Sequence, residues 1–211
     1  MTTLDPAALP LPTPEHVRLG TAAFAAQGQV TECAIQNLLR AFPGNTVTAD
    51  ILLKVVVINQ IYSTGILAVQ PVAERIQAAD IDAALQAGDP DVVHRIDRLQ
   101  FVTAAGKVID RSIYSFATKY CAHHQPRHYP IYDGIISAKL LAYQKRDGFT
   151  RPFSDADLRT YATFKTVMLA FQAQYGLTAC SLRDIDQFLW VLGKGQLPDA
   201  PAAPPAPLRY P

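Results

Sequence analysis

The residues best suited to chemistry lie in one stretch, SFATKYCAHHQPRHYPIYDGIISAKL, at positions 115 to 140. A lysine, a cysteine, three histidines and an aspartate surround a turn between two segments with helical patterning. Asp133 comes directly before the second segment, where an aspartate is a favoured N-cap. A carboxylate held by helix amides can also stabilise positive charge that develops on a substrate. The sequence leaves both roles open, and they are compatible.

Lys119 lies on the helical segment before the turn. It is either a solvated lysine at the end of a core helix or a cation beside Asp133 that binds a phosphate or keeps the carboxylate charged. Cys121 and His123 are two positions apart, which points them in different directions on a helix, and no second ligand pair of recognised spacing occurs. We therefore expect no metal site, and the sequence gives no indication of any other cofactor.

The segment from 107 to 151 is basic, with eight Lys and Arg residues against three Asp residues in a chain of net charge +1. Such a segment is either a solvated face or a contact for a phosphate-bearing partner, most simply DNA. The candidate nucleic-acid contacts are Arg111, His123, His124, Arg127, His128 and Lys139. The candidate base-stacking side chains are Tyr120, Tyr129 and Tyr132. Trp190, among apolar neighbours, is expected to be a core anchor.

These residues must be positioned by helices, because helical periodicity covers nearly all of the chain between its ends. We expect an all-α protein with a single globular domain of eight to ten helices at 14–197. We see no convincing pair of alternating strands. The predicted helices lie at 14–27, 31–42, 48–62, 66–79, 81–88, 91–105, 111–124, 134–146, 155–175 and 182–194.

Both ends are rich in proline and are predicted to be loosely held, as an extended leader at 1–13 and a flexible tail at 198–211. The tails could serve as ligands for a protein partner. The start of the chain lacks the pattern of a signal peptide, and its most apolar run, 51–69, is too polar to span a bilayer, so we expect no membrane association. Three widely spaced cysteines argue against a disulfide framework and fit a reducing cytoplasm.

Several enzyme classes lack their motifs. No G-x-S-x-G, P-loop, G-x-G-x-x-G or H-E-x-x-H pattern occurs, so acyl hydrolysis, nucleoside triphosphate use and zincin chemistry have no support. The remaining indication is a resemblance. The blocks ILLKVVVINQIYSTGI, SFATKYCAHHQPRHYPIYDG and YGLTACSLRDIDQFLWVLGK are similar to a family of bacterial proteins of unassigned function.

More distantly, SFATKY…YPIYDGIIS resembles the part of helix-hairpin-helix DNA glycosylases in which a Pro-x-Asp stretch opens a helix. In those all-α enzymes that aspartate is the catalytic carboxylate, and Asp133 holds its place here. The segment IDRSIYSFATK, however, has no glycine where those enzymes carry a Gly-x-Gly hairpin. Lys119 also lies further along its helix than the lysine of their lyase members, so lyase activity is not inferred.

The resemblance implies a monofunctional DNA N-glycosylase. Asp133 would stabilise an oxocarbenium-like sugar after a base is flipped into a pocket, and Lys119, Arg127 and the histidines would hold flanking phosphates. We expect Asp133 to face an open pocket lined by basic side chains. One alternative is a helical module on the same scaffold that binds nucleic acid or protein without catalysis, as in a defence or mobile-element system. Another is a structural interaction protein.

Overall fold

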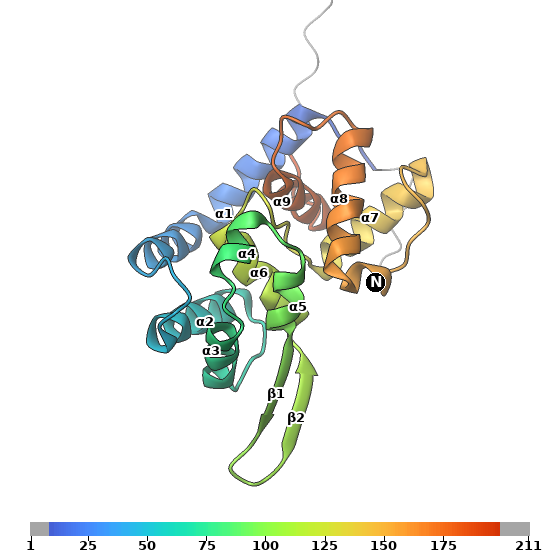
Figure 1. The fold of residues 1–211 in the computed structure, drawn as a ribbon. Helices are drawn as coiled ribbons and strands as arrows, with labels where there is room; N and C mark the ends of the chain where they lie inside the picture. The colour runs from blue at the N-terminus through green and yellow to red at the C-terminus, as the bar shows by residue number, and fades with distance from the viewer. Residues whose placement is uncertain (1–8, 199–211) are drawn as a thin grey trace, which may run out of the picture.

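The computed structural model describes residues 9–198, which form a mostly helical body with one protruding hairpin (Figure 1). Nine α-helices, one short 3-10 helix and two strands occur in this range. In order they are α1 (Pro14–Ala41), α2 (Thr48–Tyr62), α3 (Val69–Ala78), α4 (Asp82–Ala87), α5 (Asp91–Asp97), β1 (Arg98–Val102), β2 (Val108–Ser112), α6 (Tyr114–His124), α7 (Gly134–Asp147), η2 (Asp157–Arg159), α8 (Tyr161–Gln174) and α9 (Leu182–Gly193).

Helix α1 is continuous over 28 residues, where the sequence predicted two helices. Thr13 caps it as expected, because its hydroxyl accepts a hydrogen bond from the His16 amide at 3.2 Å. Along its length α1 packs on α9, and the two backbones come very close at Gly20. A Cβ at position 20 would lie 2.8 Å from Phe188 Cα, so the crossing requires glycine. This contact places the middle of α1 beside the candidate site.

The strands β1 and β2 correct the prediction of an all-α protein. They pair antiparallel, with Leu99 opposite Arg111 and Val102 opposite Val108, and they extend away from the helices (Figure 1). The expected helix at 91–105 therefore ends at Asp97. Leu99 is buried and Phe101 half-buried while Gln100 between them is exposed, which is the period-two pattern of a strand. The hairpin leads directly into α6.

Helix α6 runs through the centre of the body, and nine of its eleven residues are buried. Behind it a cluster of tyrosines hydrogen-bonds to backbone carbonyls. Tyr161 donates to Pro130 O at 2.9 Å, and Tyr129 donates to Asp89 O at 2.8 Å. The extended segment from Pro130 to Asp133, which joins α6 to α7, is thereby fixed against the core.

The described part of the leader is also held in place, contrary to the prediction. Leu9 is buried, Arg146 donates to Leu9 O at 2.6 Å, and Tyr143 donates to Pro10 O at 2.9 Å. Residues 1–8 and nearly all of the proline-rich tail, 199–211, lie outside the described residues. No helix between residues 9 and 198 is both long and apolar enough to cross a membrane.

Candidate functional site

Asp133 does cap a helix. Its backbone is extended, and its Oδ1 accepts a hydrogen bond from the Ile135 amide at 2.8 Å, so α7 begins at Gly134. The other carboxylate oxygen, Oδ2, accepts no hydrogen bond from any residue in the described range. The residue is half-buried. One oxygen therefore serves the helix, and the second is available to a ligand.

Asp133 lines the wall of a cavity of about 410 Å³ between α1, α2, α6 and α9. Three aromatic side chains contribute to this cavity, and they are Phe24, Tyr62 and Trp190. Five charged side chains do so, and they are Glu32, Lys119, Asp133, Arg183 and Asp186. Three carboxylates thus face two cations, and the lining is mixed, not predominantly basic as predicted. We call this cavity the central pocket.

Lys119 shares the central pocket with Asp133, so the structure brings the two predicted catalytic residues together. The side chain is buried, and its Nζ donates to Ser115 Oγ at 2.6 Å and lies 5.5 Å from the centre of the Tyr62 ring. Burial lowers the Lys119 pKa, and the charge of Asp133 opposes this change. Asp133 thus stabilises the charged form of a lysine that burial would otherwise neutralise.

The floor of the pocket is a hydrogen-bonded chain of side chains from three helices. Arg183 donates to Asp186 Oδ1 at 2.6 Å and to Glu32 Oε1 at 3.3 Å, and its guanidinium lies 5.3 Å from the centre of the Phe24 ring. Glu32 also accepts the Tyr62 hydroxyl at 3.1 Å. A planar cation fixed between two carboxylates presents a rigid edge of donors and acceptors.

Asp186 joins this floor to the segment that carries Asp133. Its Oδ2 accepts the Ile131 amide at 2.8 Å, two residues before the catalytic candidate. The side chain is fully buried, and burial raises the Asp186 pKa to about 6 although Arg183 lowers it. Asp186 therefore helps to fix the position of the 131–133 backbone relative to the pocket.

His123 lies behind Tyr62 and not on the surface. Its Nε2 is 2.8 Å from the Tyr62 hydroxyl, which has one proton and gives it to Glu32, so His123 Nε2 must carry the hydrogen. Burial, followed by the charge of Arg183, lowers the His123 pKa to about 3. His123 is thus neutral at physiological pH, and it supports the pocket from behind.

Most of the other predicted contacts are not where the sequence indicated. His124 is half-buried, with its pKa lowered to about 3 chiefly by burial, and Lys139 is buried against α9. The three candidate stacking tyrosines are core residues, because all the apolar faces of α6 and its following loop are used in packing. They are Tyr120, Tyr129 and Tyr132, and none lines the central pocket.

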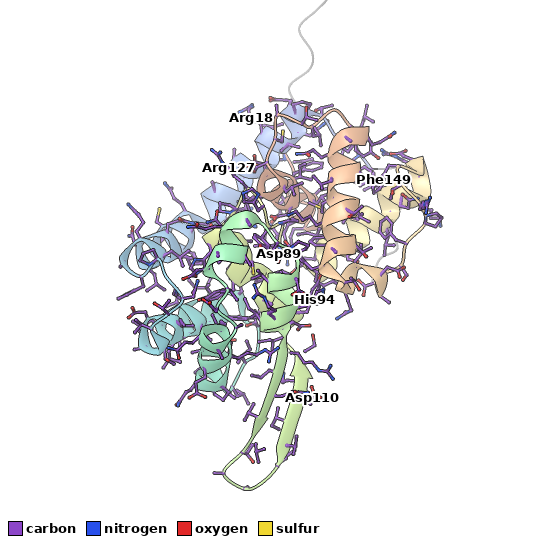
Figure 2. All side chains as sticks on the ribbon, in the orientation of Figure 1. Arg18, Asp89, His94, Asp110, Arg127 and Phe149 are labelled. Atoms are coloured by element: carbon purple, nitrogen blue, oxygen red, sulfur yellow. The ribbon has the colours of Figure 1, made fainter. Side chains whose placement is uncertain are left out.

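Arg111, Arg127 and His128 are exposed, as predicted for surface contacts. They do not form one patch. Arg127 and His128 border a concavity with Lys165 and the start of α9, whereas Arg111 borders a different one beside Asp133. Figure 2 shows Arg127 on the helical body, well away from Asp110 of the hairpin. Within residues 9–198 no group of three His, Cys, Asp or Glu side chains could hold a metal ion.

Four contributors to the site were not predicted from the sequence, and they are Glu32, Tyr62, Arg183 and Asp186. Trp190 was predicted to lie in the core, whereas this half-buried ring lines the pocket. One signal was available. Asp186 stands between Leu182 and Leu189 on the apolar stripe of α9, with Arg183 three positions before it. A charged residue on an apolar stripe with a partner at that spacing indicates a buried ion pair.

Fold and site together define a mostly helical protein in which a helix-capping aspartate and a buried lysine share an aromatic-lined pocket. Residues 22–128 match the family model HI_0787_N, described as an N-terminal domain, and the chain belongs to this family. The matched region contains Lys119 and most of the α1 and α2 wall. It stops before Asp133, α7 and α9.

A protein of Haemophilus influenzae (strain ATCC 51907 / DSM 11121 / KW20 / Rd), described as an uncharacterized protein, is 40% identical over 141 residues. The alignment covers 66% of this chain and 64% of that protein, which is less than two thirds of the relative's length. No solved structure matches the chain.

Proposed function

We propose that this protein hydrolyses the N-glycosidic bond of a nucleotide extruded from DNA, with Asp133 as the catalytic carboxylate. The observation that carries the proposal is the position of Asp133, which lines a cavity of about 410 Å³ and has one carboxylate oxygen without a hydrogen bond from the described residues. That volume lies within the range of small-ligand sites. Phe24, Tyr62 and Trp190 offer aromatic surface to a flipped base.

The chemistry would follow from charge. As the bond between C1′ and the base nitrogen breaks, positive charge develops on the sugar, and the Asp133 carboxylate stabilises it. Water then adds to C1′, and its proton passes to the departing base. Asp133 in turn favours the charged form of Lys119, while the Glu32–Arg183 pair offers acceptors and donors to the edge of the base. Asp186 holds the 131–133 backbone in place.

A helix-hairpin-helix glycosylase scaffold is part of this proposal. The support is the order of the elements, in which α6 carries the lysine, a Pro130–Asp133 segment follows, and α7 opens at the aspartate. The glycine hairpin that the resemblance would require is replaced by β2 and its junction with α6. Without the glycine hairpin, DNA would have to be held by another element of the protein.

The test uses Asp133→Asn, because asparagine caps helices as well as aspartate does but carries no charge. We expect unchanged helix content and duplex binding, with base release reduced by about a hundredfold or more. The assay incubates the protein with duplexes that contain uracil, hypoxanthine, or oxidised or alkylated purines, and reveals abasic sites by alkaline cleavage.

Asp184→Asn is the matched control, since Asp184 lies in the first turn of α9 and outside the central pocket. It should leave base release unchanged. Equal losses of helix content and activity in Asp133→Asn would show that Asp133 only caps the helix. If the wild type binds duplexes but releases no base from any substrate, the result would favour the alternative of a binding module without catalysis.

A further inference from the structure

We propose that the β1–β2 hairpin, with Arg111 and Arg159 at its base, forms an arm that holds duplex DNA beside the central pocket. This inference rests on the proposed function, because it names the surface that would present a nucleotide to Asp133. The arm takes the place of the missing glycine hairpin. Its partner is the sugar-phosphate backbone of a duplex.

The first support is a concavity of about 310 Å³ between the end of β2, the first turn of α6 and the start of α7. It adjoins the central pocket at three points. Thr64 lines it and follows Ser63 of the pocket, and Gly134 lines it and follows Asp133. Ser115, a third lining residue, accepts the hydrogen bond from Lys119. Because phosphates flank every sugar, a sugar over Asp133 would direct a phosphate toward this concavity.

The second support is the charge of its walls. Arg111 is exposed, and its side chain makes no hydrogen bond or ion pair with any residue between 9 and 198. Arg159 has a side chain that is 61% exposed, one ion pair with Asp155 at 3.4 Å, and a guanidinium 5.8 Å from the centre of the Tyr132 ring. Asp155 already accepts the hydroxyls of Tyr132 and Ser137 at 2.8 and 2.6 Å. Two exposed guanidinium groups therefore line the concavity and can bind a phosphate bidentately.

The third support is the hairpin itself, which extends from the body without a core behind its tip (Figure 1). Val102 and Val108 pair across the strands there and are 64% and 69% exposed, next to Lys107. A two-stranded ribbon with exposed apolar side chains is only marginally stable by itself. It does, however, match the width of a DNA major groove. The hairpin's one acidic strand residue, Asp110, is paired with Arg98 at 3.5 Å.

The test compares two double variants that remove the same charge from the same basic segment. Arg111→Gln/Arg159→Gln alters the arm, and Lys145→Gln/Arg151→Gln alters exposed positions on the body. Binding of a labelled duplex is followed by fluorescence anisotropy between about 50 and 200 mM salt. We expect the arm variant to bind about tenfold more weakly or worse, with a salt slope reduced by about two, while the body variant stays near the wild type.

A second comparison addresses the tip. Val102→Ser/Val108→Ser should leave the melting temperature unchanged, because both side chains are exposed, and should weaken duplex binding. Three results would refute the proposal that the hairpin holds DNA. They are equal weakening of duplex binding by both charge variants, unchanged binding by the arm variant, and no duplex binding by the wild type. If base release does not depend on Arg111 and Arg159, the proposed role of the arm is refuted, but the proposed catalysis is not. Arm-dependent binding without base release on any substrate would overturn only the proposed catalysis.

Discussion

The buried His123 and the half-buried His124 should make the folded protein sensitive to mild acid. Burial is the main cause that lowers the pKa of His123 and of His124 to about 3, from 6.5 for a free histidine. The unfolded chain therefore binds more protons than the folded protein between pH 6.5 and 3. Stability is fully present above 6.5 and is lost as the pH falls through this window.

The size of the effect follows from these pKa values. Each histidine removes about 1.4 kcal/mol of stability per pH unit, so a change from pH 6.5 to about 4.5 costs about 3 kcal/mol per residue. Asp186 acts in the opposite direction, because its pKa of about 6 lies above the usual 3.8. Its protonation in the folded state therefore adds about 2 kcal/mol to the stability between pH 6.5 and about 4.5. The net loss of about 3 to 4 kcal/mol is a large part of a typical domain stability.

The assay is urea unfolding, followed by far-UV circular dichroism at several pH values between about 6.5 and 4.5. His124→Phe keeps a ring next to Tyr120, whose centroid lies 4.9 Å away, and removes the titrating group. No partner is orphaned, because His124 Nε2 has no hydrogen bond. The stability difference between wild type and variant should change by about 3 kcal/mol across the window.

His128→Gln is the control, since His128 is exposed, and it should reproduce the pH dependence of the wild type. An unchanged pH dependence in His124→Phe would refute the reasoning. It would mean that this ring accepts a proton in the folded state as easily as in the unfolded chain, and hence that water reaches it.

Two other substitutions test the packing around the site. Gly20→Ala should destabilise the protein by about 1–3 kcal/mol in thermal unfolding, because its Cβ would meet the α9 backbone at 2.8 Å. In the same helix Gly28→Ala should stabilise by up to about 1 kcal/mol, because nothing lies within 4 Å of that Cβ, and equal effects would contradict the close crossing. Asp186→Leu should cost about 3–5 kcal/mol in urea unfolding, since it leaves Arg183 and the Ile131 amide without their buried acceptor, and a near-neutral result would show that water replaces it.

Local patterns predicted most of the helices correctly, and their errors have physical causes. The expected break in α1 near Gly28 does not occur, because a helical glycine costs only about 1 kcal/mol and the contacts with α9 outweigh it. Strand β1 was predicted as the end of a helix because Leu99 and Phe101 fit either period in so short an apolar run. The exposed β2 segment offers little hydrophobic contrast, so its strand pairing is visible only in three dimensions.

The site was predictable where it is local. Asp133 and Lys119 lie close in sequence on either side of one turn, and both line the pocket. Glu32 and Arg183 are far apart in the chain, and only the packing of α1 on α9 brings them together. His123 and His124 were misplaced because α6 is buried on nearly all sides, so its polar residues could not be assigned to an exposed face.

Trp190 is the sole tryptophan of the 211-residue sequence, and its indole forms part of the central pocket, edge-on to Phe24 with ring centres 5.5 Å apart. Emission excited at the red edge of the absorption band therefore comes from this cavity alone. Any planar compound that enters should alter the intensity or wavelength of that emission. Unlabelled protein thus carries its own optical probe, suited to screening nucleobases and nucleosides one by one.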